Sequence, residues 1–340
     1  MRNRKSGITR FLVVVIGLAL AGAGIYMIDQ LMQPWKGFSE PVIVEFPRGT
    51  STSQMASILA EHGVIQQPWQ FLAARLARRG QRLQAGEYQF STAASPLDVY
   101  SRIARGDVYY MELLVPEGFN MFDVAGAVAQ LGTMSAETFL AAARDPGLIQ
   151  DLDPKAESLE GYLFPNTYRV QRKTTAHEIC RMMTAAFRAR WQALPEAVKS
   201  SMALHDAVTL ASLVEREARL PEERPLVASV FQNRLRIGMK LDCDPTTVYA
   251  ALLEGRYRGV IHQSDLASDN PYNTYRHAGL PPGPIANPGL SSIKAALSPE
   301  ATEHLYFVAK ADGSGGHTFT DSLEQHAAAV AQYHRATKNR

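Results

Sequence analysis

Cysteine is scarce in this chain, which has Cys180 and Cys243 among its 340 residues. The sequence has no Cys-x-x-Cys pair, no His-Glu-x-x-His motif and no histidine–cysteine cluster at zinc-binding spacing. We therefore expect no structural or catalytic zinc ion and no other cofactor. A chain of this length does not need a disulfide for its stability, so the two cysteines could either pair or remain buried free thiols.

An excess of charge of one sign is also lacking. Lysine and arginine number 35 and aspartate and glutamate 33, which leaves a net charge of +2. No basic stretch is interleaved with aromatic residues, so we expect no nucleic-acid partner. GSGGH at 313–317 is not a phosphate-binding loop, because no Lys-Ser/Thr follows it and it joins two predicted strands.

A long apolar run is present at the N-terminus, from Phe11 to Ile28. At 1.5 Å per residue it spans roughly 27 Å as a helix, close to the hydrocarbon thickness of a bilayer. Four basic residues precede it within residues 1–10, so the positive-inside rule predicts a cytoplasmic tail and an exported remainder. A cleaved signal peptide is the alternative, but the run is longer than usual for one and lacks a clear cleavage site. We expect a retained anchor in the cytoplasmic (inner) membrane, with the rest of the chain periplasmic.

A small α+β module is predicted next, over residues 42–118. Hydrophobic periodicity and capping residues predict its strands and helices. The strands are at 42–46, 86–90 and 108–118, and the helices within 47–65, at 69–80 and at 95–106. The module has no cluster of titratable groups, so it either binds a ligand or serves as a packing unit.

The remainder, residues 119–340, is predicted to be a larger and mainly helical domain with a C-terminal β-hairpin. Its predicted helices are at 121–132, 135–145, 177–194, 206–220, 224–238 and about 322–336. Strands at 304–310 and 317–320 flank the DGSGG turn. The fold class is thus α+β, after a single transmembrane helix.

A loop-rich stretch at 240–292 interrupts this helical pattern. It is rich in tyrosine, asparagine, proline and glycine, as in KLDCDPTTVY and DNPYNTYRHAGLPPGPIANPGL. Long polar loops often form binding clefts. Tyrosine rings that stack on sugar faces, with asparagine amides that bind hydroxyl groups, would suit a glycan. A purely structural irregular region explains the composition as well.

Two carboxylates lie in the otherwise apolar helical segment LASLVEREA at 210–218. On a helical wheel Glu215 and Glu217 lie on opposite edges of the apolar stripe, and neither is on the fully solvated face. Burial at such an edge raises the pKa of a carboxyl group towards that of a working general acid. Periodicity makes both residues candidates and does not choose between them.

The chain resembles the YceG-like family, the MltG-type endolytic murein transglycosylases, over most of its predicted exported length. The motifs that carry the resemblance are LEGYLFPNTY (159–168), LASLVEREA (210–218), FQNRLRIGMKLDCDPTTVYA (231–250), PYNTY (271–275), GLPPGPIANPG (279–289) and LYFVAKADGSGGHTF (305–319). Asn166 departs from the pattern, since an aspartate is usual after this proline. The module at 42–118 resembles the LysM-like subdomain of the family.

The resemblance implies cleavage within peptidoglycan glycan strands, at the β-1,4 bond from N-acetylmuramic acid to N-acetylglucosamine. Glu215 matches the catalytic acid in this interpretation, and Glu217 supports it. One carboxyl group suffices if the muramyl C6 hydroxyl closes a 1,6-anhydro ring without water. The candidate substrate-binding residues are Glu160, Tyr162, Glu217, Asn233, Asp242, Asp244, Tyr249, Asn273 and Tyr275. Asp242 and Asp244 could instead bind a metal, but Asp244-Pro245 is more typical of a turn or a helix cap.

The resemblance also implies a role in ending or trimming nascent strands, with peptidoglycan synthases (penicillin-binding proteins) as further partners. Two alternatives stay open: an inactive peptidoglycan-binding scaffold that keeps the cleft, and a muramidase that hydrolyses the bond with water.

Overall fold

The computed structural model describes residues 2–78 and 80–338, and the chain divides into two compact units, Met1–Tyr110 and Met111–Arg340. Each unit has its own hydrophobic core. Within the described residues, the strands form two-stranded antiparallel sheets, β1–β2, β3–β4 and β5–β6. The predicted mixture of helices and strands is therefore confirmed.

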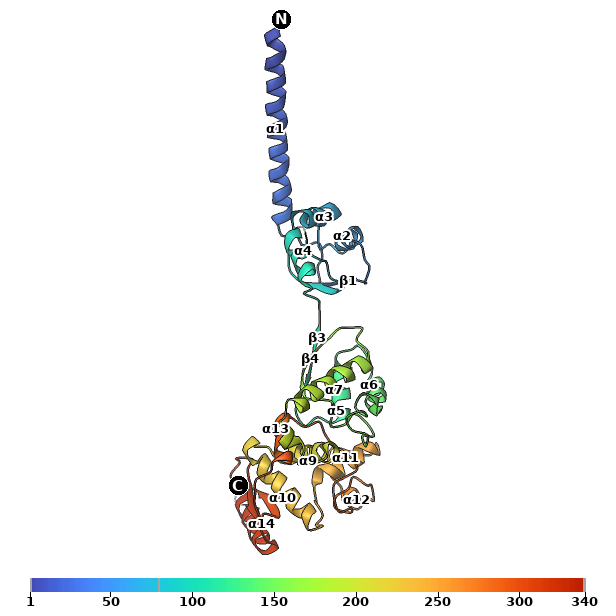
Figure 1. The fold of residues 1–340 in the computed structure, drawn as a ribbon, viewed down its shortest axis with the longest axis vertical. Helices are drawn as coiled ribbons and strands as arrows, with labels where there is room; N and C mark the ends of the chain where they lie inside the picture. Colours follow the sequence, from blue (N-terminus) through green and yellow to red (C-terminus); the bar gives the residue numbers. More distant parts are fainter. Residues whose placement is uncertain (1, 79, 339–340) are drawn as a thin grey trace. The chain divides into compact units, whose positions relative to one another are not determined.

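The first unit begins with a long helix, α1, shown in blue in Figure 1. The other elements of this unit are β1 (Val42–Phe46), α2 (Thr52–Glu61), α3 (Pro68–Ala77), β2 (Gly86–Phe90) and α4 (Pro96–Arg105), after α1 (Arg2–Met32). The segment Phe11–Met32 of α1 has a mean hydropathy of 2.5 and is long and apolar enough to cross a membrane. Near the end of α1, Leu31 is buried in the core of the small unit.

Local sequence signals explain the helices of the small unit. Ser51 and Gln54 form a capping box at the start of α2, and Ser95 caps α4. The strands β1 and β2 pair from Val42 opposite Phe90 to Phe46 opposite Gly86. Buried aromatic side chains pack between the sheet and the helices, and the largest of them are Phe46, Phe71, Tyr88, Phe90 and Tyr100. This packing accounts for a compact unit of modest size.

The second unit begins with a strand that the sequence analysis assigned to the end of the small module. That strand, β3 (Met111–Val115), pairs with β4 (Asn166–Val170), which the sequence did not predict. Leu113 and Val115 of β3 and Tyr168 and Val170 of β4 are all buried in the core of the second unit. The small unit therefore ends before the predicted boundary at residue 118, because the apolar face of β3 is buried in the larger core.

The other elements of the second unit are mainly helices. They are α5 (Met121–Gln130), α6 (Ala136–Ala143), η1 (Pro146–Leu148), α7 (Ala176–Gln192), α8 (Glu196–Lys199), α9 (Leu204–Glu217), η2 (Pro221–Glu223), α10 (Arg224–Arg236), α11 (Asp244–Leu253), α12 (Gln263–Leu266), α13 (Leu290–Leu297), β5 (Tyr306–Ala309), β6 (His317–Thr320) and α14 (Leu323–Lys338). The predicted hairpin at DGSGG is confirmed as β5–β6. The stretch at 240–292 is less irregular than expected, because Asp244-Pro245 starts α11.

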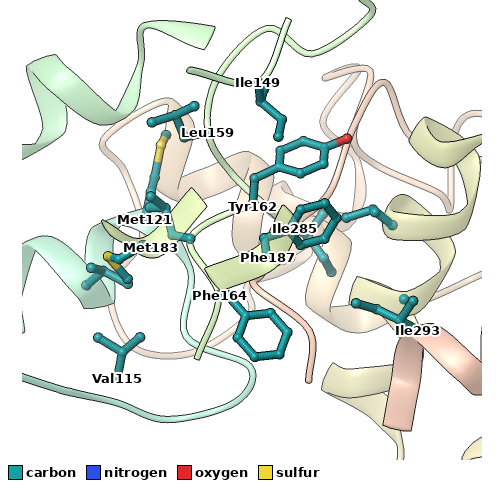
Figure 2. Packing of buried hydrophobic residues seen from close by; sticks show 14 of the residues in the cluster. Val115, Met121, Ile149, Leu159, Tyr162, Phe164, Met183, Phe187, Ile285 and Ile293 are labelled. Carbon is teal, nitrogen blue, oxygen red and sulfur yellow. The ribbon is translucent and has the colours of Figure 1, made fainter. Parts of the chain in front are cut away.

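The helix α9 lies at the centre of the second unit, where it contacts α10, α11 and α13 (Figure 1). Every residue from Ala207 to Val214 is buried. Figure 2 shows part of the same core, with Tyr162, Phe187 and Ile285 among its labelled side chains. A helix buried on all faces has no solvated face for a glutamate in its interior. Glu215 and Glu217 are held at its carboxyl end, where the core meets the surface.

Candidate active site

The two glutamates of α9 lie in different surroundings. Residues two apart on a helix are rotated by about 200°, so their side chains leave the helix in nearly opposite directions. Glu215 is in the last turn and Glu217 is the final helical residue, before Ala218 adopts an extended conformation. The two side chains therefore enter different surroundings.

Glu215 is enclosed by hydrogen-bond donors. Its Oε1 accepts from Nη2 of Arg224 at 2.8 Å, and its Oε2 accepts from the backbone N–H of Gly289 at 2.8 Å. The side chains of Glu215 and Arg224 are 4% and 10% exposed. Arg224 also donates to Ser291 and, at 3.3 Å, to Glu117. Glu215 is thus one member of a buried ion-pair cluster that joins α9, α10 and the start of α13.

The backbone lies close to this cluster. A Cβ atom at Gly289 would lie 1.9 Å from Oε1 of Glu117, the end of a flexible and partly exposed side chain that would have to move. Gly118 adopts a φ of +80° next to Glu215, and its carbonyl accepts from Arg216 at 3.1 Å. The backbone at Gly118 and Gly289 and the side chain of Arg224 thus close around Glu215. This close packing is suited to holding the unit together.

Glu217 lies on the wall of a cavity of about 440 Å³, a volume within the range of ligand pockets. The other residues of this wall come from α10, the segment before α11, the loop after α12, the hairpin strand β5 and α14. They are Phe231, Arg234, Leu241, Asp242, Asp244, Tyr275, Tyr306, Phe307, Leu323 and His326. We call this space the Glu217 cavity. Its mixture of carboxylates, aromatic rings and one guanidinium is the kind that can hold a polar ring-shaped ligand.

The surroundings of Glu217 favour its protonated form. Burial is the main cause of a raised pKa of Glu217, and the negative charge of Asp244 adds to it. The thiol of Cys243, which donates to Oε1 at 3.2 Å, and the positive charges of His317 and Arg216 oppose the shift. A carboxyl group with a raised pKa that lies on a cavity wall can give a proton to a bound molecule.

Three of the predicted binding residues lie on the same wall as Glu217. Asp242 adopts a φ of +46°, its carboxylate lies 3.7 Å from Arg234, and burial raises its pKa. The hydroxyl of Tyr275 donates to Oδ1 of Asp244 at 2.7 Å, which fixes the ring at the edge of the cavity. The cavity therefore brings together Glu217, Asp242, Asp244 and Tyr275, which the sequence separates by up to 58 positions.

Three other predicted binding residues lie in the core. Glu160 is 2% exposed, accepts from Met121 N at 2.8 Å and from Asn287 Nδ2 at 3.0 Å, and burial raises its pKa to about 8. Tyr162 is wholly buried and its hydroxyl donates to Asp153. Tyr249 is 2% exposed and its ring packs against Tyr272. These side chains pack in the core of the second unit and do not line the Glu217 cavity.

Two asparagines that the sequence suggested for sugar binding hold loops in place. The amide of Asn273 is fully buried and donates to the carbonyls of Asp265, Leu266 and Ser268. The amide of Asn233 donates to the carbonyls of Thr302 and His304 at 2.8 and 3.0 Å. The amide N–H groups of both asparagines are bound to backbone carbonyls, and neither side chain lines the Glu217 cavity.

Several residues of the cavity wall were not singled out from the sequence. Arg234 donates to the carbonyls of Leu305 and Leu241, and its guanidinium lies 5.3 Å from the ring centre of Tyr306. His326 stacks on the same ring at 5.1 Å, and its Nδ1 is buried with no hydrogen-bond partner among the described residues. Burial and the charge of Arg234 lower the pKa of His326. Arg234 and Tyr306 lie within the motifs at 231–250 and 305–319. Membership of these motifs is the sequence signal that could have identified them.

The structure settles the state of the two cysteines. Cys180 and Cys243 are both buried free thiols. Of the two arrangements that the sequence left open, the structure has the unpaired one. No group of three or more His, Cys, Asp or Glu side chains in residues 2–78 and 80–338 has an arrangement that could hold a metal ion.

Comparison with known proteins gives consistent matches over most of the chain. A model of the YceG-like family matches residues 44–332. A crystal structure of a YceG-like protein from Listeria monocytogenes is similar in fold, with a TM-score of 0.56 and 32% sequence identity. The match covers 86% of this chain and 99% of the Listeria chain. The family-model match begins after α1 and includes residues of both compact units.

Two curated relatives are also similar. The endolytic murein transglycosylase of Bacillus subtilis is 34% identical over 335 residues, which cover 93% of this chain and 91% of the relative. The endolytic murein transglycosylase of Streptococcus pneumoniae is 29% identical, over 97% of this chain and 65% of the relative.

Proposed function

The chain belongs to the YceG-like family, and from this premise we propose that it is a membrane-anchored lytic transglycosylase that cleaves peptidoglycan within its glycan strands. Relatives named endolytic murein transglycosylases support the reaction. The observation that carries the proposal is the Glu217 cavity, in which a half-buried carboxyl group faces a space large enough for a sugar ring.

We assign the acid to Glu217, whereas the sequence resemblance pointed to Glu215. Both oxygens of Glu215 accept from N–H donors, which an ionised carboxylate satisfies and a protonated one does not. Glu217 lines an open cavity, and among the described residues its carboxyl group accepts one hydrogen bond, from the thiol of Cys243. Burial raises its pKa. Glu215 as the acid stays a prediction, and a direct comparison of the two glutamine variants decides between them.

The reaction needs one carboxyl group. Protonated Glu217 gives its proton to the glycosidic oxygen while the bond from C1 of N-acetylmuramic acid to that oxygen breaks. The leaving N-acetylglucosamine keeps the proton as its 4-hydroxyl group. The Glu217 carboxylate then takes the proton of the muramyl C6 hydroxyl, whose oxygen bonds to C1 and closes the 1,6-anhydro ring. Glu217 ends protonated again, and no water is consumed.

The rings of Tyr275 and Tyr306 are proposed to stack on the sugars on either side of the broken bond. Both line the Glu217 cavity, and contacts with neighbouring residues hold each ring. Asp242 and Asp244 are proposed to accept hydrogen bonds from sugar hydroxyl groups. These roles need no cofactor.

The test is an analysis of products from purified peptidoglycan strands by mass spectrometry. The proposal predicts strands that end in 1,6-anhydro-N-acetylmuramic acid at internal cleavage sites. Reducing ends that carry an oxygen from water would identify a muramidase instead. Strands that are bound but not cut would identify a peptidoglycan-binding scaffold.

The anchor is proposed to cross the cytoplasmic membrane once, with both compact units outside the cytoplasm. The apolar segment Phe11–Met32 supports a span, and the basic residues before it support the orientation. A reporter that is active only outside the cytoplasm, fused after residue 340, should be active. A mature protein that begins near residue 30 would reveal a cleaved signal peptide. Roles in ending nascent strands and in meeting synthases stay predictions.

A further inference from the structure

Cys243 makes a direct contact with the proposed acid. Its Sγ lies 3.2 Å from Oε1 of Glu217, with the thiol as donor. The residue is 1% exposed and lies between Asp242 and Asp244, both of which line the Glu217 cavity. Burial, the first cause, and the charge of Glu217 hold the pKa of the Cys243 thiol well above its usual range. The thiol therefore keeps its proton and remains a donor.

The backbone around Cys243 is fixed by a buried network. Its N–H donates to Oγ1 of Thr274 at 3.0 Å, and its carbonyl accepts from Oγ1 of Thr246 at 2.6 Å. The two threonine hydroxyls lie 2.9 Å apart and both side chains are buried. This network joins the start of α11 to the loop that carries Tyr275. The Sγ atom thus has a defined position relative to α9.

We infer that the Cys243 thiol is a positioning group, which holds the Glu217 carboxyl group in the cavity and sets the pH range over which that group can act as an acid. The inference rests on the proposed role of Glu217. A thiol is a weak donor. It orients Oε1 while it stabilises the ionised form less than an N–H or O–H donor would, so the carboxyl group can remain protonated.

Other charged and titratable groups lie around Glu217. The charge of Asp244 raises its pKa, and the charges of His317 on β6 and Arg216 on α9 lower it. The other titratable groups of the cavity wall are Arg234 on α10, Asp242 before α11, Tyr275 on the loop after α12, Tyr306 on β5 and His326 on α14. None of these is changed when residue 243 is replaced. A change at residue 243 therefore alters one hydrogen bond to Glu217 while the charges stay the same.

The donor at position 243 predicts opposite effects for two substitutions. A donor to a carboxylate favours its ionised form and lowers its pKa. Cys243→Ala removes the donor, so the alkaline limb of kcat against pH should move to higher pH. Cys243→Ser supplies a stronger donor of similar size, so the same limb should move to lower pH. A residue that served only for packing would not move the limb in opposite directions.

The experiment uses the full chain in detergent and uncrosslinked glycan strands, with anhydro ends counted from pH 5 to 9. Cys243→Ala should also lower kcat by about two- to tenfold with KM nearly unchanged, the size expected for one lost hydrogen bond. Cys180→Ala and Cys180→Ser are matched controls, since Cys180 is a buried thiol on α7 outside the cavity wall. In both controls the alkaline limb of kcat should lie at the same pH as in the wild type. Thermal unfolding of each variant verifies folding.

The outcomes separate this inference from the proposed function. If Glu217→Gln retains cleavage, the proposed acid is wrong and the inference falls with it. If Glu217→Gln is inactive while both Cys243 variants keep the wild-type limb, or move it in the same direction, the inference alone is overturned. If Cys243→Ala does not fold, Cys243→Ser decides, because its limb must still move to lower pH.

Discussion

The two sides of the last turn of α9 differ in the hydrogen-bond donors that they offer to a carboxylate. On one side, Glu215 meets the guanidinium of Arg224 and the N–H of Gly289, each at 2.8 Å. On the other side, Glu217 meets one thiol and the open space of a cavity. Both glutamates are partly buried, but their hydrogen-bond donors differ. Strong donors favour the ionised carboxylate and make it a structural link, whereas a weak donor opposes the effect of burial on the pKa only slightly.

The largest expected effect is on the cavity side. Glu217→Gln keeps the shape of the side chain but has no proton to transfer, so kcat should fall by about 10²–10⁴-fold, the usual contribution of general acid–base catalysis. Binding of glycan strands should remain. Counting anhydro ends and sedimenting the protein with peptidoglycan would measure the two separately. Full turnover by this variant would contradict the comparison.

A substitution at Glu215, on the opposite side of the turn, should mainly lower the stability of the fold. Glu215→Gln leaves Arg224 buried with the partly exposed Glu117 as its remaining carboxylate partner. Removing one partner of a buried ion pair costs about 3 kcal/mol. We expect a clear drop in the denaturant midpoint and a much smaller loss of kcat than for Glu217→Gln. Glu303→Gln is a control, because the ion pair of Glu303 with Arg236 is exposed. An inactive but fully stable Glu215→Gln variant would reverse the assignment.

A smaller effect is expected at Tyr275, and it tests whether this part of the cavity wall binds the sugar. Tyr275→Phe keeps the ring and removes the hydroxyl that donates to Asp244. A hydrogen bond to a carboxylate is worth about 1.5 kcal/mol or more, so kcat/KM should fall about tenfold. Tyr257→Phe is the control and should have no effect, because Tyr257 is exposed and does not line the Glu217 cavity. Unchanged kcat/KM in Tyr275→Phe would show that this part of the wall does not bind the sugar.

The smallest effect is expected at the other end of α9, where an ion pair depends on pH. His205 Nδ1 lies 2.7 Å from Oδ2 of Asp153, and Nε2 lies 2.8 Å from the carbonyl of Pro282. Both ring nitrogens face acceptors, so the imidazolium form fits best. The hydrogen bond to Asp153 is the main cause of a raised pKa of His205.

Stability from this pair should be complete below the unfolded pKa of 6.5 and should be lost as pH rises through the raised folded pKa. A contribution of about 1 kcal/mol corresponds to about 3 °C in Tm for a unit of this size. His205→Gln should remove this pH dependence, whereas His334→Gln, an exposed control, should keep it. Equal pH dependence in His205→Gln and the wild type would rule out the ion pair.

Local sequence signals predicted most helices and the hairpin, because caps, apolar periodicity and the DGSGG turn act over a few residues. The strand β4 was missed because its pairing with β3 joins residues that are about 55 positions apart. The length of α11 was missed because its first turn, DPTT, is polar, although Asp244-Pro245 was noted as a turn or helix cap. The motifs placed the candidate site on α9. The choice between Glu215 and Glu217 needed Arg224, Gly289 and Cys243, whose contacts arise only in the folded unit.

The most direct test of the account is a crystal structure of Glu217→Gln with a bound peptidoglycan glycan fragment. The account predicts that the fragment occupies the Glu217 cavity, with its uncut glycosidic oxygen within hydrogen-bond distance, about 3 Å, of the residue 217 side chain. It also predicts that Glu215 still contacts Arg224 and Gly289. A glycosidic oxygen next to Glu215, with the Glu217 cavity free of sugar, would contradict it.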